Sequence, residues 1–519
     1  MASASIPAQR GLGDASLDRS FFGHPRGLST LFFSEMWERF SYYGMRGFLI
    51  LYMTAPIAMG GMGLDTAAAG PIYGTYTSMV YLSNLPGGWI ADRLLGQRRA
   101  VLVGGILIAA GHFSLAVPAA LTFYFGLVLI VLGTGLLKPN ISVMVGQLYA
   151  EKDIRRDSGF SIFYMGINTG AFVGPLITGY LAQDVAFRAH LTSWGLDPNS
   201  SWHWGFGAAG VGMTLGLVQY VLGGRSLGTA GLEPTKPASA QAAARIRQQA
   251  IFGLGGGLLL LVLLGIGMAT GVLPITVAQV TGAYSYVLLA VVVIFFAWLF
   301  LAGTWTPEER KRLYLIAVFF VAAALFWSVF EQAGSTLNLF ADRSTNNSLP
   351  GYGLFPSSWW QSVNALLIIV FAPIFAWLWL KLGTTQPASP TKFAFGLIGV
   401  GLGFLVLVPA AQLASTGVKV GVQWLFLVYL IHTLAELCLS PVGLSSMTKL
   451  APARIVSLMM GVWFLGASVG NFLGGQAASF YESMPLAQLL IAVAVLPMLV
   501  GVGMLAFRKR LTALMGGVS

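Results

Sequence analysis

Fourteen windows of about 20 mostly apolar residues are the feature that most constrains the fold of this chain. Windows of this length can cross a bilayer as α-helices, which satisfy all their backbone hydrogen bonds internally. Two of them, near 250–272 and 281–303, lie between two sets of six. The two sets lie near 28–54, 68–91, 99–118, 121–148, 158–182 and 203–223, and near 312–339, 358–381, 393–411, 421–441, 455–479 and 485–507. We therefore expect an all-α membrane protein with 14 transmembrane helices.

Composition agrees with a membrane protein and disfavours an enzyme. The chain is 56% hydrophobic and 9% charged, whereas soluble domains carry about 25% charged residues. No Gly-rich stretch ends in Gly-Lys-Ser/Thr, and no triad or zinc-protease pattern is present, so we expect no cofactor, no metal and no enzymatic activity. The single cysteine, Cys438, rules out an intrachain disulfide.

The distribution of basic residues predicts the orientation in the membrane. Outside the apolar windows, only Arg188, Arg343 and Lys419 fall in connections on one side. All other Lys and Arg residues fall on the opposite side, together with both termini. Cytoplasmic loops are enriched in Lys and Arg, so both termini are expected in the cytoplasm. The excess of positive charge therefore encodes topology and does not indicate nucleic acid.

Two sets of six helices joined by a basic linker suggest the major facilitator fold, in which substrate binds between the halves at mid-membrane. The connection after the second helix supports this, because it resembles the loop signature of that superfamily and is expected to have a structural role. Its motif residues are Gly88, Asp92, Arg93, Gly96, Arg98 and Arg99. The expected parts are an N-terminal cytoplasmic tail (1–27), a six-helix bundle (28–224), a linker with an inserted two-helix hairpin (225–309), a second six-helix bundle (310–507) and a C-terminal tail (508–519).

Seven charged residues lie inside the apolar windows. A charge at mid-bilayer costs roughly 2.5–3.5 kcal/mol on insertion scales, so such residues usually mark ion or substrate pathways. Their formal charges nearly cancel, which suits pairing inside a polar cavity. This pattern is typical of a transporter. The seven are Glu35, Glu38, Arg39, Arg46, Lys138, Glu331 and Glu436.

The first helix carries most of these charges on one face. At 100° per residue, positions 35, 38, 39, 42, 43 and 46 fall within an arc of about 140°. Glu35 and Arg39 are separated by four residues, a spacing that supports ion pairing. A charge cluster that merely clamps helices together is the alternative, but the number of polar groups on this face exceeds what clamping requires.

The two halves differ in the sign of their buried charges. Arg39, Arg46 and Lys138 are the cations and all lie in the first half, whereas Glu331 and Glu436 are the only intramembrane charges of the second half. Guanidinium holds carboxylate bidentately, and lysine acts as a compact point charge. A zwitterionic substrate such as a peptide could therefore bridge the halves.

Residues 35–43, Glu-x-x-Glu-Arg-Phe-x-Tyr-Tyr, resemble the signature of the proton-coupled oligopeptide transporter family, a branch of the major facilitator superfamily. Further family-like segments cover nearly the whole chain apart from the inserted hairpin and the termini. They lie at residues 133–140, 163–170, 326–332, 361–364, 435–441 and 461–466.

The resemblance implies proton-coupled symport of di- and tripeptides by alternating access. It implies that Arg39 and Lys138 hold the peptide carboxylate and that Glu436, Asn168 and Asn364 hold the amino end. It also implies an outer gate of Arg46 with Glu331 and an inner gate of Lys138 with Glu436. The proton-coupling residues would be Glu35, Glu38, Arg39 and Glu331. The peptide-binding residues would be Arg39, Tyr42, Tyr43, Arg46, Tyr81, Lys138, Asn168, Trp327, Glu331, Asn364, Glu436, Ser440 and Trp463.

Some of these assignments have plain structural alternatives. Asn168 and Asn364 could be helix-packing hydrogen bonds, and Trp327 and Trp463 could belong to an interfacial aromatic belt. The chain also departs from the family after Trp463, where residues 466–468 (Gly-Ala-Ser) lack an expected polar residue. That departure bears on one pocket contact and not on transport.

A carrier of nitrate or another small anion on the same scaffold is the rival interpretation. The glutamates that flank the cations disfavour a lone anion. Animal relatives carry a large external domain between the ninth and tenth helices, where this chain has a short connection at 411–421. That feature and the inserted hairpin indicate a bacterial member in the cytoplasmic (inner) membrane, with peptides, protons and the lipid bilayer as partners and a monomer as the functional unit.

Overall fold

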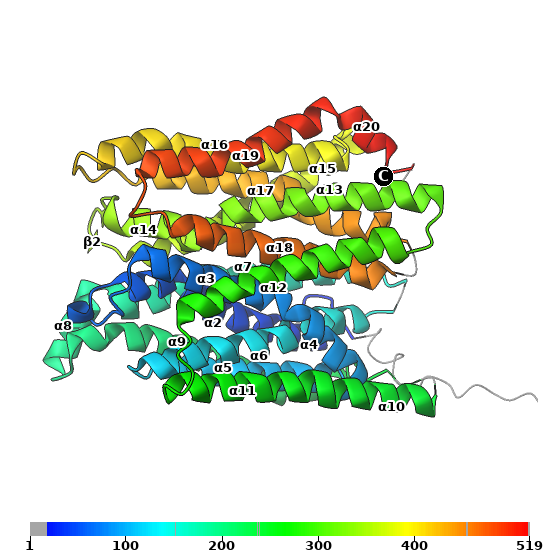
Figure 1. Ribbon diagram of the computed structural model, residues 1–519, viewed down its shortest axis with the longest axis horizontal. Helices are drawn as coiled ribbons and strands as arrows, with labels where there is room; N and C mark the ends of the chain where they lie inside the picture. Colours follow the sequence, from blue (N-terminus) through cyan, green and yellow to red (C-terminus); the bar gives the residue numbers. More distant parts are fainter. Residues whose placement is uncertain (1–17, 151, 236, 238, 453–454, 517–519) are drawn as a thin grey trace, which may run out of the picture.

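The computed structural model describes residues 18–150, 152–235, 237, 239–452 and 455–516. Long helices run side by side along the longest axis of the molecule (Figure 1). The early helices, blue to cyan, form the lower half of that view, and the late helices, yellow to red, form the upper half. Each half has its own buried apolar core, so the halves are separate bundles in contact.

The first half is built from long helices joined by short connections. The second apolar window is broken at Ser83 into α3 and α4, and a short helix α8 precedes the last long helix. The helices of this half are α2 (Gly27–Thr54), α3 (Thr66–Leu82), α4 (Asn84–Ile90), α5 (Gln97–Leu115), α6 (Ala120–Gln147), α7 (Arg156–Gln183), α8 (Val185–Ser193) and α9 (Ser201–Leu222).

The second half repeats this plan. Its first window ends in a 3₁₀ turn at Glu331–Gly334, after which a shorter helix follows. A two-stranded antiparallel hairpin, β1 (Ser348–Leu349) and β2 (Gly353–Leu354), precedes the next long helix. The helices are α13 (Pro307–Phe330), α14 (Thr336–Arg343), α15 (Gln361–Leu382), α16 (Ser389–Ala414), α17 (Gln423–Leu450), α18 (Val456–Ala478), α19 (Leu486–Ala506) and α20 (Arg508–Ala513).

The inserted segment is more helical than the sequence suggested. Besides the expected two-helix hairpin, the segment 225–309 contains the helix α10 (Ala240–Gln249), which precedes the first apolar window of the hairpin. Ser239 Oγ caps this helix by accepting from Ala242 N–H at 3.1 Å, and the alanines that follow have high helix propensity. The helix continues through a π-turn into α11 (Gly256–Ala269), and α12 (Val277–Ala297) returns.

Twelve helices of the described chain are long and apolar enough to cross a membrane, so the expected count of 14 is not confirmed by this measure. Two helices of the first half, α2 and α3, are not among these twelve. The charge pattern accounts for the first, because α2 contains Glu35, Glu38, Arg39 and Arg46. Length accounts for the second, because α3 has 17 residues before the break at Ser83.

The loop motif holds the linker against the first half. Arg98 donates from its backbone N–H to Gly231 O and from Nη2 to Gly228 O, both at 2.8 Å. Thr235 N–H donates to Asp92 O at 2.8 Å. Gly96 has φ +77°, and a Cβ there would lie 2.9 Å from Leu232 O, so the close approach requires glycine. The structural role expected for this motif thus includes anchoring the start of the linker.

The two halves meet tightly at the end remote from the chain termini. A Cβ on Gly74 of α3 would lie 2.7 Å from Gly475 Cα of α18, so these helices touch backbone to backbone. Asn338 Nδ2 donates to Gly47 O at 2.7 Å. Ser362 Oγ of α15 donates to Phe172 O of α7 at 2.7 Å. This end of the interface is therefore closed.

A polar link in the loop after α18 reinforces that closure. Glu482 Oε1 accepts from Arg343 Nη1 at 2.6 Å, and Oε2 accepts at 3.2 Å from the N–H of Thr66, the first residue of α3. That N–H has no acceptor within its helix. Burial raises the pKa of Glu482, but the hydrogen bonds from Arg343 and Thr66 outweigh it and leave the pKa below its ordinary value.

We expect Glu482→Gln to increase the population open at this end by up to about fivefold at neutral pH, the upper range for an exposed ion pair. A carboxyl with a depressed pKa contributes stability above its ordinary pKa and loses it as pH falls through the depressed value. The difference between parent and variant should therefore shrink once the pH falls below the ordinary glutamate pKa of about 4.3 and disappear only below the depressed value. Spin labels at Ala67 and Gln488 in a Cys438→Ser background would report the distance. Equal distance distributions at pH 7 would contradict the link, and Glu308→Gln is the control.

Candidate functional site

One face of α2 carries a buried charged stripe, as its periodicity predicted. Glu35, Glu38, Arg39 and Arg46 are each no more than 5% exposed. Buried charges are tolerated when they are paired and hydrogen-bonded. Each of these side chains has such a partner, so the stripe forms the polar centre of the interface rather than a lipid-facing surface.

Arg39 forms a compact cluster with two carboxylates. Its Nε and Nη2 donate to the two oxygens of Glu38, the latter at 2.5 Å, and Nε lies 3.3 Å from Glu35 Oε1. The expected pairing at i,i+4 is thus present. The guanidinium lies 5.2 Å from the ring centre of Tyr42 and 5.8 Å from that of Tyr43. Among the described residues, Glu35 Oε2 has no hydrogen-bond partner, which leaves one acceptor open.

Arg46 joins the two halves. Its Nη2 pairs with Glu331 Oε2 and donates to the Glu331 backbone oxygen at 3.1 Å. Its Nε donates to Tyr73 Oη at 2.6 Å. Because α13 ends at Phe330, the 3₁₀ turn that follows aims Glu331 into the interface. A Cβ on Gly334 would meet Tyr73 Oη at 1.9 Å, so the glycine leaves room for the tyrosine.

Lys138 lies close to the Arg46–Glu331 ion pair but does not take part in it. Its Nζ lies 4.4 Å from the ring centre of Tyr81, a cation–π contact, and Tyr81 Oη donates to Glu331 Oε1 at 3.5 Å. The ion pairs of the described residues do not include Lys138 with Glu436. Of the two expected gate pairs, one is formed and the other is not.

Glu436 of α17 is held by neutral groups. Asn364 Nδ2 of α15 donates to Glu436 Oε2 at 3.1 Å and to Thr433 Oγ1 at 3.0 Å. The structure therefore brings together Glu436 and Asn364, which the sequence assigned to the same end of the substrate. Asn168 is different, because its Nδ2 donates within α7 to Tyr164 O at 2.9 Å. That contact lies within one helix and decides neither alternative, so the assignment of Asn168 stays a prediction.

The two tryptophans have unequal surroundings. Trp327 is half-buried, and its indole N–H lacks a partner in the described chain. Trp463 is 6% exposed and packs edge-on to Phe393 at 6.4 Å within the core of the second half. Ser440 is half-buried, one helical turn after Glu436. Trp327 is thus better placed than Trp463 to meet a ligand.

Sequence reasoning missed Tyr73 and Thr433. Tyr73 is the second partner of Arg46, and Thr433 shares the Asn364 amide with Glu436. A signal for the first was present, because Tyr73, Tyr76 and Tyr81 recur within one apolar window. Three phenols in a lipid-length segment indicate a polar face. Nothing in the sequence around Thr433 distinguishes it from an ordinary helix-packing threonine.

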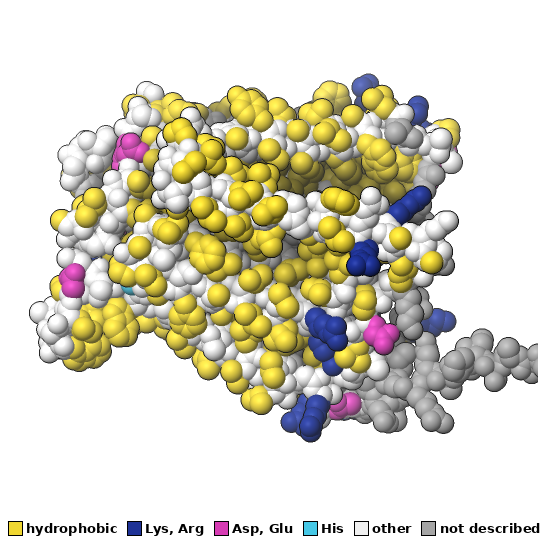
Figure 2. Space-filling view, turned by 60° about the horizontal axis from the view of Figure 1, so that its bottom comes forward, with side chains coloured by type: hydrophobic (Ala, Val, Ile, Leu, Met, Phe, Trp, Pro, Cys, Tyr) yellow, Lys and Arg dark blue, Asp and Glu magenta, His cyan; other side chains and the backbone are white. Residues whose placement is uncertain are grey.

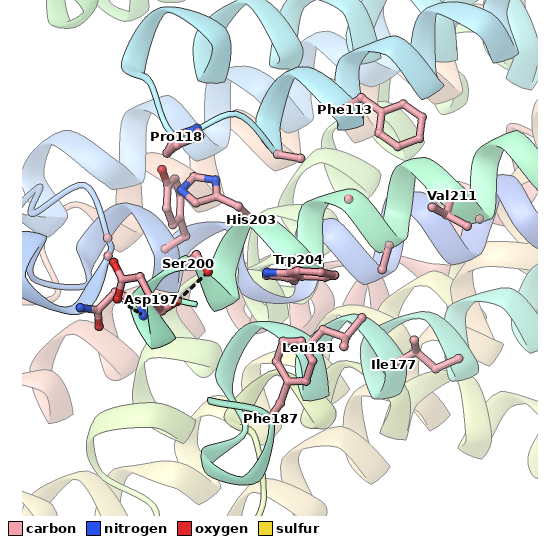
Figure 3. Close-up of a pocket in the computed structure, with 18 of the residues that line it drawn as sticks. Phe113, Pro118, Ile177, Leu181, Phe187, Asp197, Ser200, His203, Trp204 and Val211 are labelled. Atoms are coloured by element: carbon pink, nitrogen blue, oxygen red, sulfur yellow. Dashed lines mark hydrogen bonds between the residues drawn. The ribbon is translucent and has the colours of Figure 1, made fainter. Parts of the chain in front are cut away.

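A mainly apolar cavity lies away from these charged residues. It has a volume of about 1250 Å³ and is lined mainly by apolar and aromatic residues of α5, α7, α9 and neighbouring loops (Figure 3). In that view Trp204, Phe113 and Val211 lie along it, and Asp197, Ser200 and His203 lie at one end. None of the charged residues described above lines it.

Comparison with known proteins decides the family. A family model described as the POT family matches residues 98–493, more than half of the chain. The chain belongs to the POT family. This membership makes it a multi-pass membrane transporter and not an enzyme, as the sequence predicted.

Curated bacterial relatives of this POT family member match along most of their length. The chain is 43% identical over 474 residues to the peptide transporter YePEPT of Yersinia enterocolitica subsp. palearctica serotype O:3, with 88% of each chain covered. It is 36% identical over 509 residues to the di-/tripeptide transporter of Lactococcus lactis subsp. cremoris, covering 96% of this chain and 98% of the relative.

Solved structures agree in fold. A crystal structure of a peptide transporter POT in complex with sulfate superposes with a TM-score of 0.88 at 41% identity, covering 99% of this chain and 100% of the other. A POT family transporter in complex with 5-aminolevulinic acid gives 0.85 at 35% identity, with 95% and 98% covered. The expected major facilitator architecture of POT transporters is thereby confirmed.

Proposed function

We propose that this protein is a proton-coupled symporter that carries di- and tripeptides into a bacterial cell by alternating access. The observation that carries the proposal is the state of the two gate pairs. Arg46 and Glu331 join the halves at one end, while Lys138 and Glu436 have other partners. A carrier that exposes its centre to one side at a time needs two such pairs that form alternately.

The opposed charges of the halves support a peptide as the substrate. The N-half contributes Arg39 and Lys138, which would hold the carboxylate. The C-half contributes Glu436 with Asn364, which would hold the amino end. Relatives named as peptide and di-/tripeptide transporters agree with this choice. The further lining residues we propose are Tyr42, Tyr43, Tyr81, Asn168, Trp327, Ser440 and Trp463.

The Arg39 cluster supports proton coupling. Its guanidinium donates two hydrogen bonds to Glu38 and lies close to Glu35, so its donors are largely occupied. A proton on either carboxylate would weaken that hold and free donors for a peptide carboxylate. Glu331 would take part in the same way at the outer gate, since its protonation removes the charge that pairs with Arg46. Binding of a proton would thus favour binding of the peptide.

We further propose 14 crossings with both termini in the cytoplasm. Besides the 12 apolar helices, α2 crosses because its charges face the interface, and α3 crosses together with α4 across the bend at Ser83. On the face drawn in Figure 2 the Lys and Arg side chains lie in the right-hand half, whereas the few Asp and Glu side chains are divided between left and right. Cytoplasmic loops are enriched in Lys and Arg, so this distribution supports a protein of the inner membrane whose basic end faces the cytoplasm.

Uptake by proteoliposomes tests the proposal. With an alkaline interior and an imposed potential, we expect labelled dialanine to accumulate inside and a proton ionophore to abolish accumulation. Excess unlabelled di- or tripeptide should compete, whereas nitrate should not. Nitrate uptake under the same gradient, without peptide uptake, would overturn the proposal in favour of the anion carrier. Peptide equilibration that is insensitive to the gradient would overturn proton coupling.

A further inference from the structure

The inserted helix α12 lies against the junction of the two halves. Figure 1 draws α12 across the front of the molecule, while α10 and α11 run along the bottom edge of the view. Of the 18-residue apolar window within α12, 17% of the residues are buried. Tyr284, at 5% exposure, is buried together with Thr281 and Leu288, and its side chain enters the contact between α3 and α18. Other residues of the insertion also contact the transport domain, since the ring centre of Phe296 lies 4.9 Å from that of Phe320 of α13. Tyr284 differs from them in that its side chain enters the junction of the two halves.

Three hydroxyl groups form a chain at this point. Tyr284 Oη lies 2.8 Å from Ser78 Oγ of α3, and Ser78 Oγ lies 2.8 Å from Ser468 Oγ of α18. Ser468 Oγ also donates to the Ser78 backbone oxygen at 2.9 Å. Both serines are fully buried. The chain therefore links the insertion to both halves without any solvent-exposed member among the serines.

The direction of the chain follows from counting protons. Each hydroxyl has one proton, and a carbonyl can only accept. The Ser468 hydroxyl donates its proton to the Ser78 carbonyl oxygen. In the contact between the two serine hydroxyls, Ser78 must therefore be the donor. Because the Ser78 proton is then used, Tyr284 must donate to Ser78. Removal of the tyrosine hydroxyl leaves the Ser78 oxygen without its donor while the serine–serine contact remains.

The ring of Tyr284 makes a second contact with the other half. Its centre lies 5.6 Å from that of Phe472 of α18, in an edge-to-face arrangement. Phe472 lies one turn from Gly475, the residue whose backbone touches Gly74 of α3. The hydroxyl is thus bound to the first half and the ring to the second, at the place where the halves are in backbone contact.

We propose that Tyr284 is a positioning residue through which the inserted helix stabilises the closed α3–α18 contact and so sets the ratio of the two access states. The inference rests on alternating access between the halves. In the state open at this end, α3 and α18 separate and Tyr284 loses one of its partners. The insertion therefore acts as a bias toward the state described here and not as an inert membrane anchor.

Distance measurements test this directly. Spin labels at Ala67 of α3 and Gln488 of α19, both exposed, would be placed in a Cys438→Ser background and reconstituted in lipid nanodiscs. We expect Tyr284→Phe to raise the ratio of open to closed populations roughly threefold, the average effect of one interhelical hydrogen bond in a membrane. Tyr284→Ala should raise it further. Tyr286→Phe on the same helix is the matched control, because Tyr286 is 76% exposed.

The outcomes separate this inference from the proposed function. If the parent shows two distances whose ratio Tyr284→Phe leaves unchanged, the positioning role is overturned and alternating access stands. If the parent shows one distance with or without peptide and at every pH, both are overturned. A variant that lowers the melting temperature without changing the ratio assigns Tyr284 a merely structural role, which also overturns the inference.

Discussion

Glu331→Gln is expected to abolish proton-driven accumulation of peptide while leaving peptide exchange measurable. Glutamine keeps the shape of a protonated glutamate but cannot gain or lose a proton. Arg46 then retains Tyr73 and the backbone oxygen of residue 331 as acceptors, so the local fold should persist. One proton moving down about 100 mV supplies roughly 2.3 kcal/mol, equivalent to about fiftyfold accumulation. The variant should lose that whole factor.

Proteoliposomes measure the two activities separately. Uptake of labelled dialanine under a pH gradient should fall to simple equilibration, while exchange against dialanine preloaded inside should remain within about tenfold of the parent. Glu308→Gln is the control, since Glu308 is exposed at the start of the same helix α13. Gradient-driven accumulation by Glu331→Gln at the parental level would refute the outer-gate assignment.

Lys138→Ala is expected to eliminate accumulation and to weaken peptide binding. The structure gives Lys138 a ring contact with Tyr81 and leaves it without an ion-pair partner among the described residues, so its charge is available to a ligand carboxylate. A charge-assisted hydrogen bond of this kind is worth about 1.5–3 kcal/mol. Binding should therefore weaken by roughly 10- to 150-fold.

Titration calorimetry with a dipeptide and with its C-terminal amide distinguishes a binding role from a structural one. The parent should prefer the free acid, and Lys138→Ala should lose most of that preference. Lys152→Ala, in the exposed connection after α6, is the control and should behave as the parent. If Lys138→Ala keeps the full preference for the free acid and wild-type uptake, the lysine does not contact the carboxylate.

Much of the site was predictable because charge inside apolar windows is conspicuous. Periodicity predicted one charged face on α2, and the four charges of that face, Glu35, Glu38, Arg39 and Arg46, are buried. Partners were harder to predict. The i,i+4 pair of Glu35 with Arg39 follows from helix geometry. The Asn364–Glu436 contact joins positions 72 residues apart, and no local rule predicts such a contact.

Helix boundaries show the same division between local and distant information. The windows located nearly every long helix, because length and hydropathy are local properties. The start of α10 at Ala240 was missed, because its polar, alanine-rich turn precedes the apolar run. The end of α13 before Glu331 was also missed, since the apolar pattern continues through the 3₁₀ turn that redirects the chain.

The sequence by itself determined the class of protein, an all-helical membrane transporter, and the positions of the charged residues within its apolar windows, because each follows from local composition and periodicity. Only the tertiary structure decided which gate pair is formed and which end of the interface is closed. Those depend on contacts between two bundles whose residues lie far apart in the sequence, and no local rule predicts such contacts. Tyr284 illustrates this: an ordinary tyrosine in an apolar run becomes a link between halves through its neighbours in space.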